Sequence, residues 1–156
     1  MAYSCYMREN RVVSSEENKA IVRRFFEQAW SKGELDVVDE VVATAGQTPP
    51  DQLPAAAGVK ETIRLYRAGL PDLVMSVEDQ VAEGDKVVTR FVGRGTHRGE
   101  FMGIAPTDKP ITVHGMSLYR LSDGRIVEGW DSWDKSELTQ QLGATPHLTN
   151  TAGGSA

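Results

Sequence analysis

The hydrophobic pattern of this chain changes its period near Leu73, and this change limits the folds that are open to it. Before this point apolar residues recur every three or four positions, as in helices that bury one face. After it they alternate with polar residues, as in strands that have one face in a core. Helices followed by antiparallel strands predict an α+β domain, in which the helices cover one face of a curved sheet.

Three helices are expected in the first half of the chain. Ser14 and Glu17 have the spacing of a capping box, and apolar residues follow at helical spacing as far as Gly33. A short second helix is predicted over residues 34–43 and a third over 59–68. The segment TAGQTPPDQLPAA between them is rich in Pro, Gly and Thr, and therefore predicts a loop.

Four strands are expected in the second half, arranged as two hairpins. Alternation predicts strands over residues 73–81 and 87–96, joined by the turn EGD. It also predicts strands over 111–121 and 126–133, joined by the turn SDGR.

The length and composition fit one globular domain. The chain has 156 residues, of which 40% are hydrophobic, and this is enough apolar material for a core. We expect an N-terminal extension over residues 1–14, the domain over 15–143 and a flexible polar tail over 144–156.

Charge and cysteine content argue against several classes of protein. The formal net charge of −5 has the wrong sign for binding a nucleic acid backbone. A single cysteine, Cys5, allows no internal disulfide and no thiolate metal cluster, and there is no HxH, CxxC or HExxH spacing. No apolar run has the length of a signal core or a membrane span. These features predict a cytoplasmic protein with no metal site and no membrane or nucleic acid partner.

Several segments together resemble the SnoaL-like polyketide cyclases of the NTF2-like superfamily. They are GDKV, GTHRGEFMGIAPT, DGRIVE and the closing QLG, and the resemblance covers about residues 16–143. It implies a cone in which a strongly curved antiparallel sheet wraps around three N-terminal helices and encloses a deep apolar pocket. Such proteins are commonly homodimers or higher oligomers and need no cofactor or metal. They include ring-forming cyclases, isomerases, hydrolases and relatives with no catalytic activity.

Asp131 is the candidate catalytic residue. Strict alternation places it on one face of the last strand with Val127, Gly129 and Trp133, and a carboxylate that faces an apolar pocket has a raised pKa. The resemblance implies that an aspartate at this point is the acid and base. The alternative is a structural aspartate, bonded to a neighbouring hydroxyl or backbone amide.

Asp134 has a different prediction. Glu137 follows it three residues later and leucines then recur at helical spacing, which predicts a helix N-cap with a reciprocal partner.

The sequence departs from the cyclases that it resembles at several pocket positions. Gly129 and Ser117 stand where those enzymes often have histidine, so a histidine-assisted proton relay is not expected. The Pro-rich segment also replaces an acidic, aromatic and His-bearing segment, and should reshape the mouth of the pocket.

Other side chains are candidates for substrate binding. His97 could reach the pocket rim or could hold the loop turn in which it lies. Asp79 is in phase with inward apolar residues, so it could be a second inward carboxylate or could cap a turn. The remaining candidates are Phe26, Trp30, Tyr66, Phe91, Ser117, Tyr119 and Trp133.

Three functions remain open on these grounds. The first is a cyclase or isomerase that acts on a hydrophobic polyketide-like intermediate, either through Asp131 as acid and base or through the shape of the pocket alone. The second is a hydrolase of the epoxide type with Asp131 and Asp79 as a pair, and the third is a binding protein without catalysis.

A homodimer is also expected, because the outward face of the last two strands is apolar. The residues predicted on this face are His114, Met116, Leu118, Ile126 and Trp130.

Overall fold

The computed structural model describes residues 13–44 and 55–143 of the chain. Most of the predicted N-terminal extension with Cys5, most of the Pro-rich loop and the C-terminal tail lie outside these residues. The predicted α+β architecture is confirmed, with helices packed against a four-stranded antiparallel sheet. No helix within the described ranges is long and apolar enough to cross a membrane.

The first helix begins where the sequence predicts. The α1 helix (Ser15–Arg24) starts with a complete capping box, in which the Ser14 hydroxyl accepts the Glu17 N–H and the Glu17 carboxylate accepts the Ser14 N–H. The helix continues without a break into the π-helix η1 (Phe25–Trp30). Its hydrogen bonds span one residue more than those of an α-helix, and such turns are frequent at functional sites. The helical spacing in the sequence did not distinguish the two.

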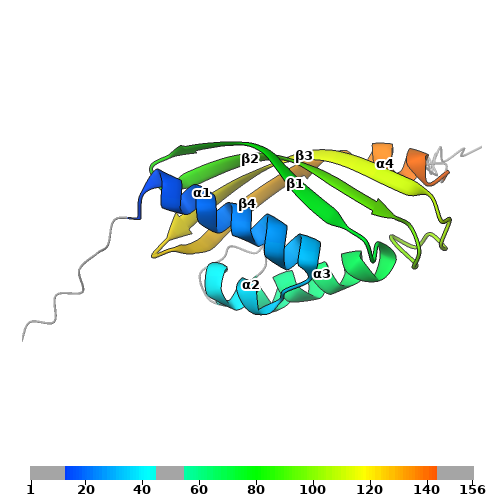
Figure 1. Ribbon diagram of the computed structural model, residues 1–156, viewed down its shortest axis with the longest axis horizontal. Helices are drawn as coiled ribbons and strands as arrows, with labels where there is room; N and C mark the ends of the chain where they lie inside the picture. Colours follow the sequence, from blue (N-terminus) through cyan, green and yellow to red (C-terminus); the bar gives the residue numbers. More distant parts are fainter. Residues whose placement is uncertain (1–12, 45–54, 144–156) are drawn as a thin grey trace, which may run out of the picture.

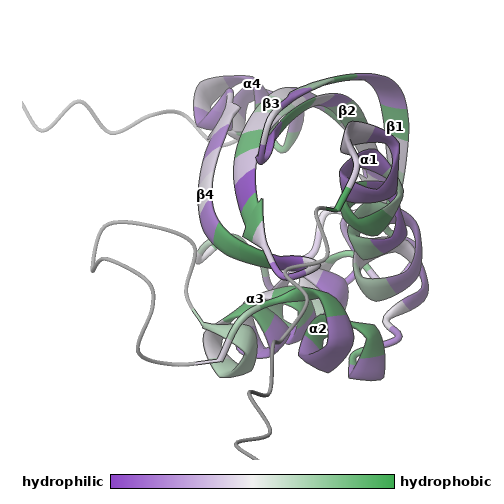
Figure 2. Ribbon diagram, turned by 90° about the vertical axis from the view of Figure 1, so that its left-hand side faces the viewer, coloured by the Kyte–Doolittle hydropathy of each residue, from purple (hydrophilic) through white to green (hydrophobic). Residues whose placement is uncertain are grey.

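The four strands form a simple meander. They are β1 (Val74–Glu83), β2 (Lys86–Thr96), β3 (Pro110–Ser122) and β4 (Arg125–Trp133), and each pairs with the next in antiparallel fashion. Figure 1 shows the sheet arching over the N-terminal helices. Figure 2 shows the sheet curling from β1 round to β4, so that it is strongly curved but not closed.

Two irregularities in the strands correct the predicted alternation. In β1 the register shifts between Val77 and Asp79, so Asp79 is exposed and Gln80 takes the inward position opposite Thr89. Between β3 and β4 the register shifts after Arg120, and Ile126 is buried in the core rather than on the outer face. The predictions of an inward Asp79 and an outward Ile126 were therefore wrong, because a bulge reverses the face of every residue beyond it.

Two helices close the open side of the curled sheet. The α2 helix (Asp36–Val41) and the α3 helix (Ala56–Gly69) lie across this open side in Figure 2. The α3 helix begins three residues before the predicted segment. Its C-terminal residue Gly69 lies so close to the Phe101 ring that a Cβ there would be 2.7 Å from the Phe101 Cβ. Only glycine allows this approach of the loop between β2 and β3.

A last helix, α4 (Lys135–Gln141), covers the end of the sheet. Asp134 is its N-cap, as predicted, because the Asp134 carboxylate accepts the N–H groups of Ser136 and Glu137. The reciprocal bond from Glu137 is not among the hydrogen bonds of the described part of the chain. At the other end, the Gln141 amide bonds to both the N–H and the carbonyl of Thr112, at 2.8 and 2.7 Å, and fixes α4 to β3.

Candidate active site

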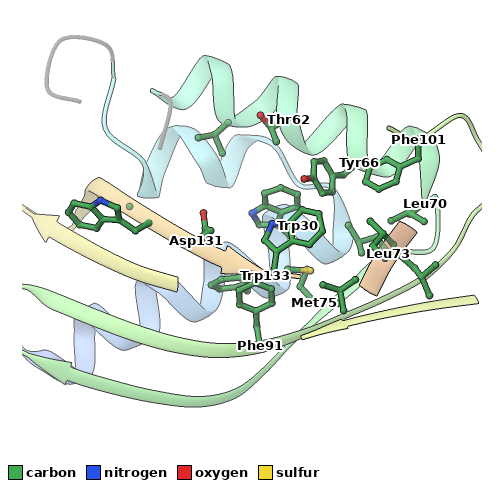
Figure 3. A pocket seen from close by; sticks show the side chains of 18 of the residues that line it. Trp30, Thr62, Tyr66, Leu70, Leu73, Met75, Phe91, Phe101, Asp131 and Trp133 are labelled. Atoms are coloured by element: carbon green, nitrogen blue, oxygen red, sulfur yellow. The ribbon is translucent and has the colours of Figure 1, made fainter. Parts of the chain in front are cut away.

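A cavity of about 420 Å³ lies between the concave face of the sheet and the helices. This volume falls in the range of small-molecule sites, and most of its wall is apolar or aromatic. Figure 3 shows labelled side chains from η1, α3, β1, β2 and β4 pointing into it. The sequence candidates that line it are Phe26, Trp30, Tyr66, Phe91, Tyr119, Asp131 and Trp133.

Other lining residues were not among the sequence candidates. Val59 and Thr62 lie on α3 seven and four residues before Tyr66, so helical spacing could have identified them from Tyr66. Phe101 and Leu138 reach the cavity from a loop and from α4, and nothing in their local sequence indicated this. The rest of the set is Leu70, Leu73, Met75, Gly93, Ile111, Val113, Gly129 and Trp130.

Asp131 is hydrogen-bonded to a neighbouring tyrosine on the same inner face. The Tyr119 hydroxyl donates to Asp131 Oδ1 at 2.9 Å. Tyr119 is paired with Gly129 across the strands, so the phenol reaches Asp131 as a diagonal neighbour. Asp131 therefore has the hydrogen bond of the structural alternative and also lines the cavity.

The surroundings of Asp131 alter its acidity. Solvent reaches the side chain through the cavity, yet protein atoms enclose it closely enough that burial raises its pKa, while the bond from Tyr119 opposes the rise. Burial also raises the pKa of Tyr119 well above its usual range, and the Asp131 charge adds to this. The carboxyl therefore keeps its proton to a higher pH than an ordinary aspartate does, and the phenol remains a hydrogen-bond donor.

A row of polar side chains crosses the sheet at the level of Asp131. Neighbouring strands pair Gln80 with Thr89, Thr89 with Ser117, and Ser117 with Asp131. Ser117 is 2% exposed and does not line the cavity. Its hydroxyl has no hydrogen-bond partner among the residues described, although it is close enough to Tyr119 to lower the pKa of that phenol slightly against the other effects.

His97 lies outside the cavity wall. It is completely buried, and its Nδ1 accepts the Thr107 N–H at 3.3 Å and lies 3.0 Å from the Thr107 hydroxyl. Its backbone N–H donates to the Lys109 carbonyl. His97 therefore holds the loop between β2 and β3, which matches the structural alternative for this residue, and not a position at the pocket rim.

Asp79 is also absent from the wall, because the bulge in β1 turns it to solvent. Within the described ranges Asp131 is the one acidic side chain that lines the cavity. The carboxylate pair expected of an epoxide hydrolase is therefore not formed. Over the same ranges, no three His, Cys, Asp or Glu side chains gather as a metal site would require.

Comparisons with known proteins agree with this geometry. The family described as SnoaL-like polyketide cyclase matches residues 20–142. TsrD from Streptomyces laurentii is a similar solved structure, with 26% identity, a TM-score of 0.77 and coverage of 85% of this chain and 98% of TsrD. IdmH from Streptomyces antibioticus, named as a candidate polyketide cyclase, has 31% identity, a TM-score of 0.69 and coverage of 81% and 99%.

A third similar structure has a different name. AclR from Streptomyces galilaeus, named as a candidate hydroxylase, has 28% identity, a TM-score of 0.74 and coverage of 88% of this chain and 87% of AclR. Among curated proteins no sequence matches significantly.

Proposed function

Because this chain belongs to the SnoaL-like polyketide cyclase family, we propose that it is an enzyme that closes a carbon ring in a polyketide-like intermediate. In this proposal Asp131 is both the base and the acid. The observation that supports it is the placement of one carboxyl, with a raised pKa and a tyrosine partner, in the wall of an aromatic cavity. The substrate is a hydrophobic natural-product intermediate with at least two carbonyl groups.

The proposed reaction is an intramolecular aldol closure. The Asp131 carboxylate removes a proton from a carbon next to a carbonyl, and the electrons of the C–H bond form an enolate. The enolate carbon attacks the second carbonyl carbon, so a C–C bond forms and its oxygen becomes an alkoxide. The alkoxide then takes the proton from Asp131. The product is an isomer of the substrate, and the carboxylate is regenerated.

Tyr119 keeps the carboxyl in place during these steps. Its bond occupies Oδ1 of Asp131, and the second oxygen has no hydrogen bond within the described part of the chain. That oxygen is free to exchange the proton. A single positioned carboxyl contributes roughly 10²- to 10⁴-fold to the rate of such a transfer.

The aromatic wall supplies the second contribution. The Phe26 and Phe91 rings lie 5.1 Å apart, and Trp30 and Tyr66 pack edge to face at 5.4 Å. A rigid wall of this kind can hold a flexible substrate with its reacting carbons close together. This part of the mechanism does not depend on Asp131, so the two contributions can be separated.

The test is the variant Asp131→Asn, assayed by ring closure of aryl-substituted 1,5-diketones to the isomeric 3-hydroxycyclohexanones, which are separated from the substrate by chromatography together with any cyclohexenone that they form by losing water. Turnover should fall by about two to four decades, because asparagine keeps the shape but cannot exchange the proton. Asp134→Asn is the matched control, since asparagine also caps helices and Asp134 lies outside the cavity. If Asp131→Asn keeps most of its rate, acid–base catalysis is wrong and the shape of the cavity carries the reaction. If the wild-type protein closes none of the diketones, the binding protein without catalysis is favoured.

A further inference from the structure

Three hydroxyl groups line the cavity, and two of them are already engaged. Tyr119 donates to Asp131, and Thr62 donates to the Gly58 carbonyl of its own helix at 2.9 Å. The third is the hydroxyl of Tyr66, which has no hydrogen-bond partner among the described residues. A phenol in an apolar wall loses hydrogen bonds to water, so a free one is expected to bind a ligand atom.

The Tyr66 ring is fixed by aromatic neighbours instead of by its hydroxyl. Its centroid lies 5.0 Å from Phe101, 5.4 Å from Trp30 and 6.5 Å from Trp133, always edge to face. Figure 3 shows the ring coming from α3, with its hydroxyl oxygen pointing into the cavity, while Asp131 comes from β4 on the other side.

The backbone that carries Tyr66 is also held firmly. The guanidinium of the next residue, Arg67, donates to the carbonyls of Trp30, Ser31 and Leu73 at 3.0, 2.7 and 3.2 Å. These bonds join the end of α3 to the end of η1 and to the segment before β1. Tyr66 therefore presents its hydroxyl from a position set by three elements, so little reordering is needed when a ligand binds.

Tyr66 and Asp131 act on one another across the cavity. Burial raises the pKa of Tyr66, and the Asp131 charge raises it further, yet the two groups share no hydrogen bond. Because the raised pKa keeps the phenol protonated, Tyr66 has an O–H that can donate to an oxygen lying between the two groups. A carboxylate on one side and a hydrogen-bond donor on the other match a carbonyl group with an acidic C–H beside it. When the carboxylate removes this proton, the carbonyl oxygen becomes negative and the donor stabilises it.

We propose that Tyr66 is a further catalytic residue. Its hydroxyl donates a hydrogen bond to the substrate carbonyl oxygen while Asp131 takes the proton from the carbon next to that carbonyl. The inference rests on the proposed function. The bond becomes stronger as the carbonyl turns into an enolate, so it lowers the barrier of the step that Asp131 begins. It also requires the ligand to place one oxygen between Tyr66 and Asp131.

The test compares two probes that differ by one oxygen, 2-naphthol and naphthalene, through quenching of tryptophan fluorescence. The oxygen of 2-naphthol can accept from Tyr66, and its O–H can donate to Asp131. Wild-type protein should bind 2-naphthol more tightly than naphthalene. Tyr66→Phe should weaken 2-naphthol about three- to tenfold and leave naphthalene within about twofold, as expected for the loss of one net hydrogen bond.

Thr62→Val is the matched control, because it also removes one hydroxyl from the wall, but one that is bound to Gly58. It should leave the ratio of the two affinities unchanged. Equal losses for both probes in Tyr66→Phe would show that Tyr66 only shapes the cavity, and this would overturn the proposal. So would a wild-type protein that binds neither probe, or binds both equally well.

The outcome separates this proposal from the proposed function. If Tyr66→Phe loses the preference for 2-naphthol while Asp131→Asn closes the ring at the full rate, the oxygen site at Tyr66 is supported and catalysis by Asp131 is rejected. If Tyr66→Phe keeps the preference while Asp131→Asn loses its activity, catalysis by Asp131 is supported and the role of Tyr66 is rejected.

Discussion

Asp131 titrates differently in the folded and the unfolded chain. Burial raises its pKa in the folded protein, whereas the unfolded chain has the ordinary carboxyl value of about 3.9. As pH rises, the unfolded state therefore loses its proton first and is stabilised relative to the folded state. Stability at this site is full below the ordinary carboxyl range and falls until the pH passes the folded pKa. A residue tuned for proton exchange thus costs stability at neutral pH.

This sign leads to a prediction for Asp131→Asn, which carries no charge at any pH. The variant should unfold at a higher temperature than the wild-type protein at pH 7, and the difference should shrink as the pH falls toward 4. Calorimetry of both proteins at matched pH values measures it. A constant difference across this range, or a less stable variant at pH 7, would contradict the raised pKa. The wild-type protein would then owe nothing of its pH dependence to this carboxyl.

At the scale of elements, the sequence predicted the order of helices and strands well, because amphipathic periods act over many residues. The inward positions of Phe91, Tyr119, Asp131 and Trp133 followed from the same periods. The sequence did not predict the bulges, since one extra residue moves the following side chains to the other face of the strand but leaves the local composition unaltered. Asp79 was misplaced for this reason.

The remaining gaps at the site concern contacts between distant elements. The bond between Tyr119 and Asp131 depends on the register of β3 and β4, and the free hydroxyl of Tyr66 depends on how α3 crosses the sheet. Phe101 enters the cavity from a loop because Gly69 lets that loop approach α3. None of these contacts has a signal within a short stretch of sequence.

The pairing of β2 with β3 supplies a prediction at this scale. Phe91 lies opposite Gly115, and a Cβ added at Gly115 would be 2.4 Å from the Phe91 Cζ atom. Gly115→Ala should therefore push the ring toward Phe26 and lower the free energy of unfolding by about 1–3 kcal/mol, as for overpacking. Urea denaturation measures this change.

Gly93→Ala is the matched control, from the neighbouring strand of the same wall. The nearest atom to its new Cβ would be the Met75 sulfur at 3.0 Å, at the far end of a flexible side chain. We expect a cost well below that of Gly115→Ala. If both variants lose the same free energy of unfolding, the two strands accommodate a new Cβ equally well, and the position of Phe91 does not depend on the missing side chain at Gly115.

On the scale of the whole molecule, the sheet has opposite characters on its two faces. On each strand, the residue adjacent to the member of the inward polar row is apolar and lies on the outer face. Together these residues form an apolar row across the outside of the sheet. Val81 and Trp130 at its two ends are 66% and 42% exposed, and Met116 nearby is 50% exposed. Trp130 also borders the cavity, because it lies on the edge strand β4. The bidentate ion pair between Arg120 and Glu128 borders this surface. The outer apolar row consists of Val81, Val88, Leu118 and Trp130.

An apolar centre with a polar border is the composition of a subunit interface, so we propose that two copies of the chain pair through this face. A two-fold axis would bring the same rows together.

Sedimentation at micromolar concentration should give the mass of a dimer, and Met116→Lys should give a monomer, because a charge buried in such a contact is unpaired. Leu65→Lys is the control, since Leu65 is 60% exposed on α3, away from the sheet, and should leave the mass unchanged. A wild-type monomer, or a dimer that survives Met116→Lys, would place the contact elsewhere or remove it. Because Asp131 follows Trp130 directly, a dimer through this face would also stiffen the strand that carries the proposed acid and base.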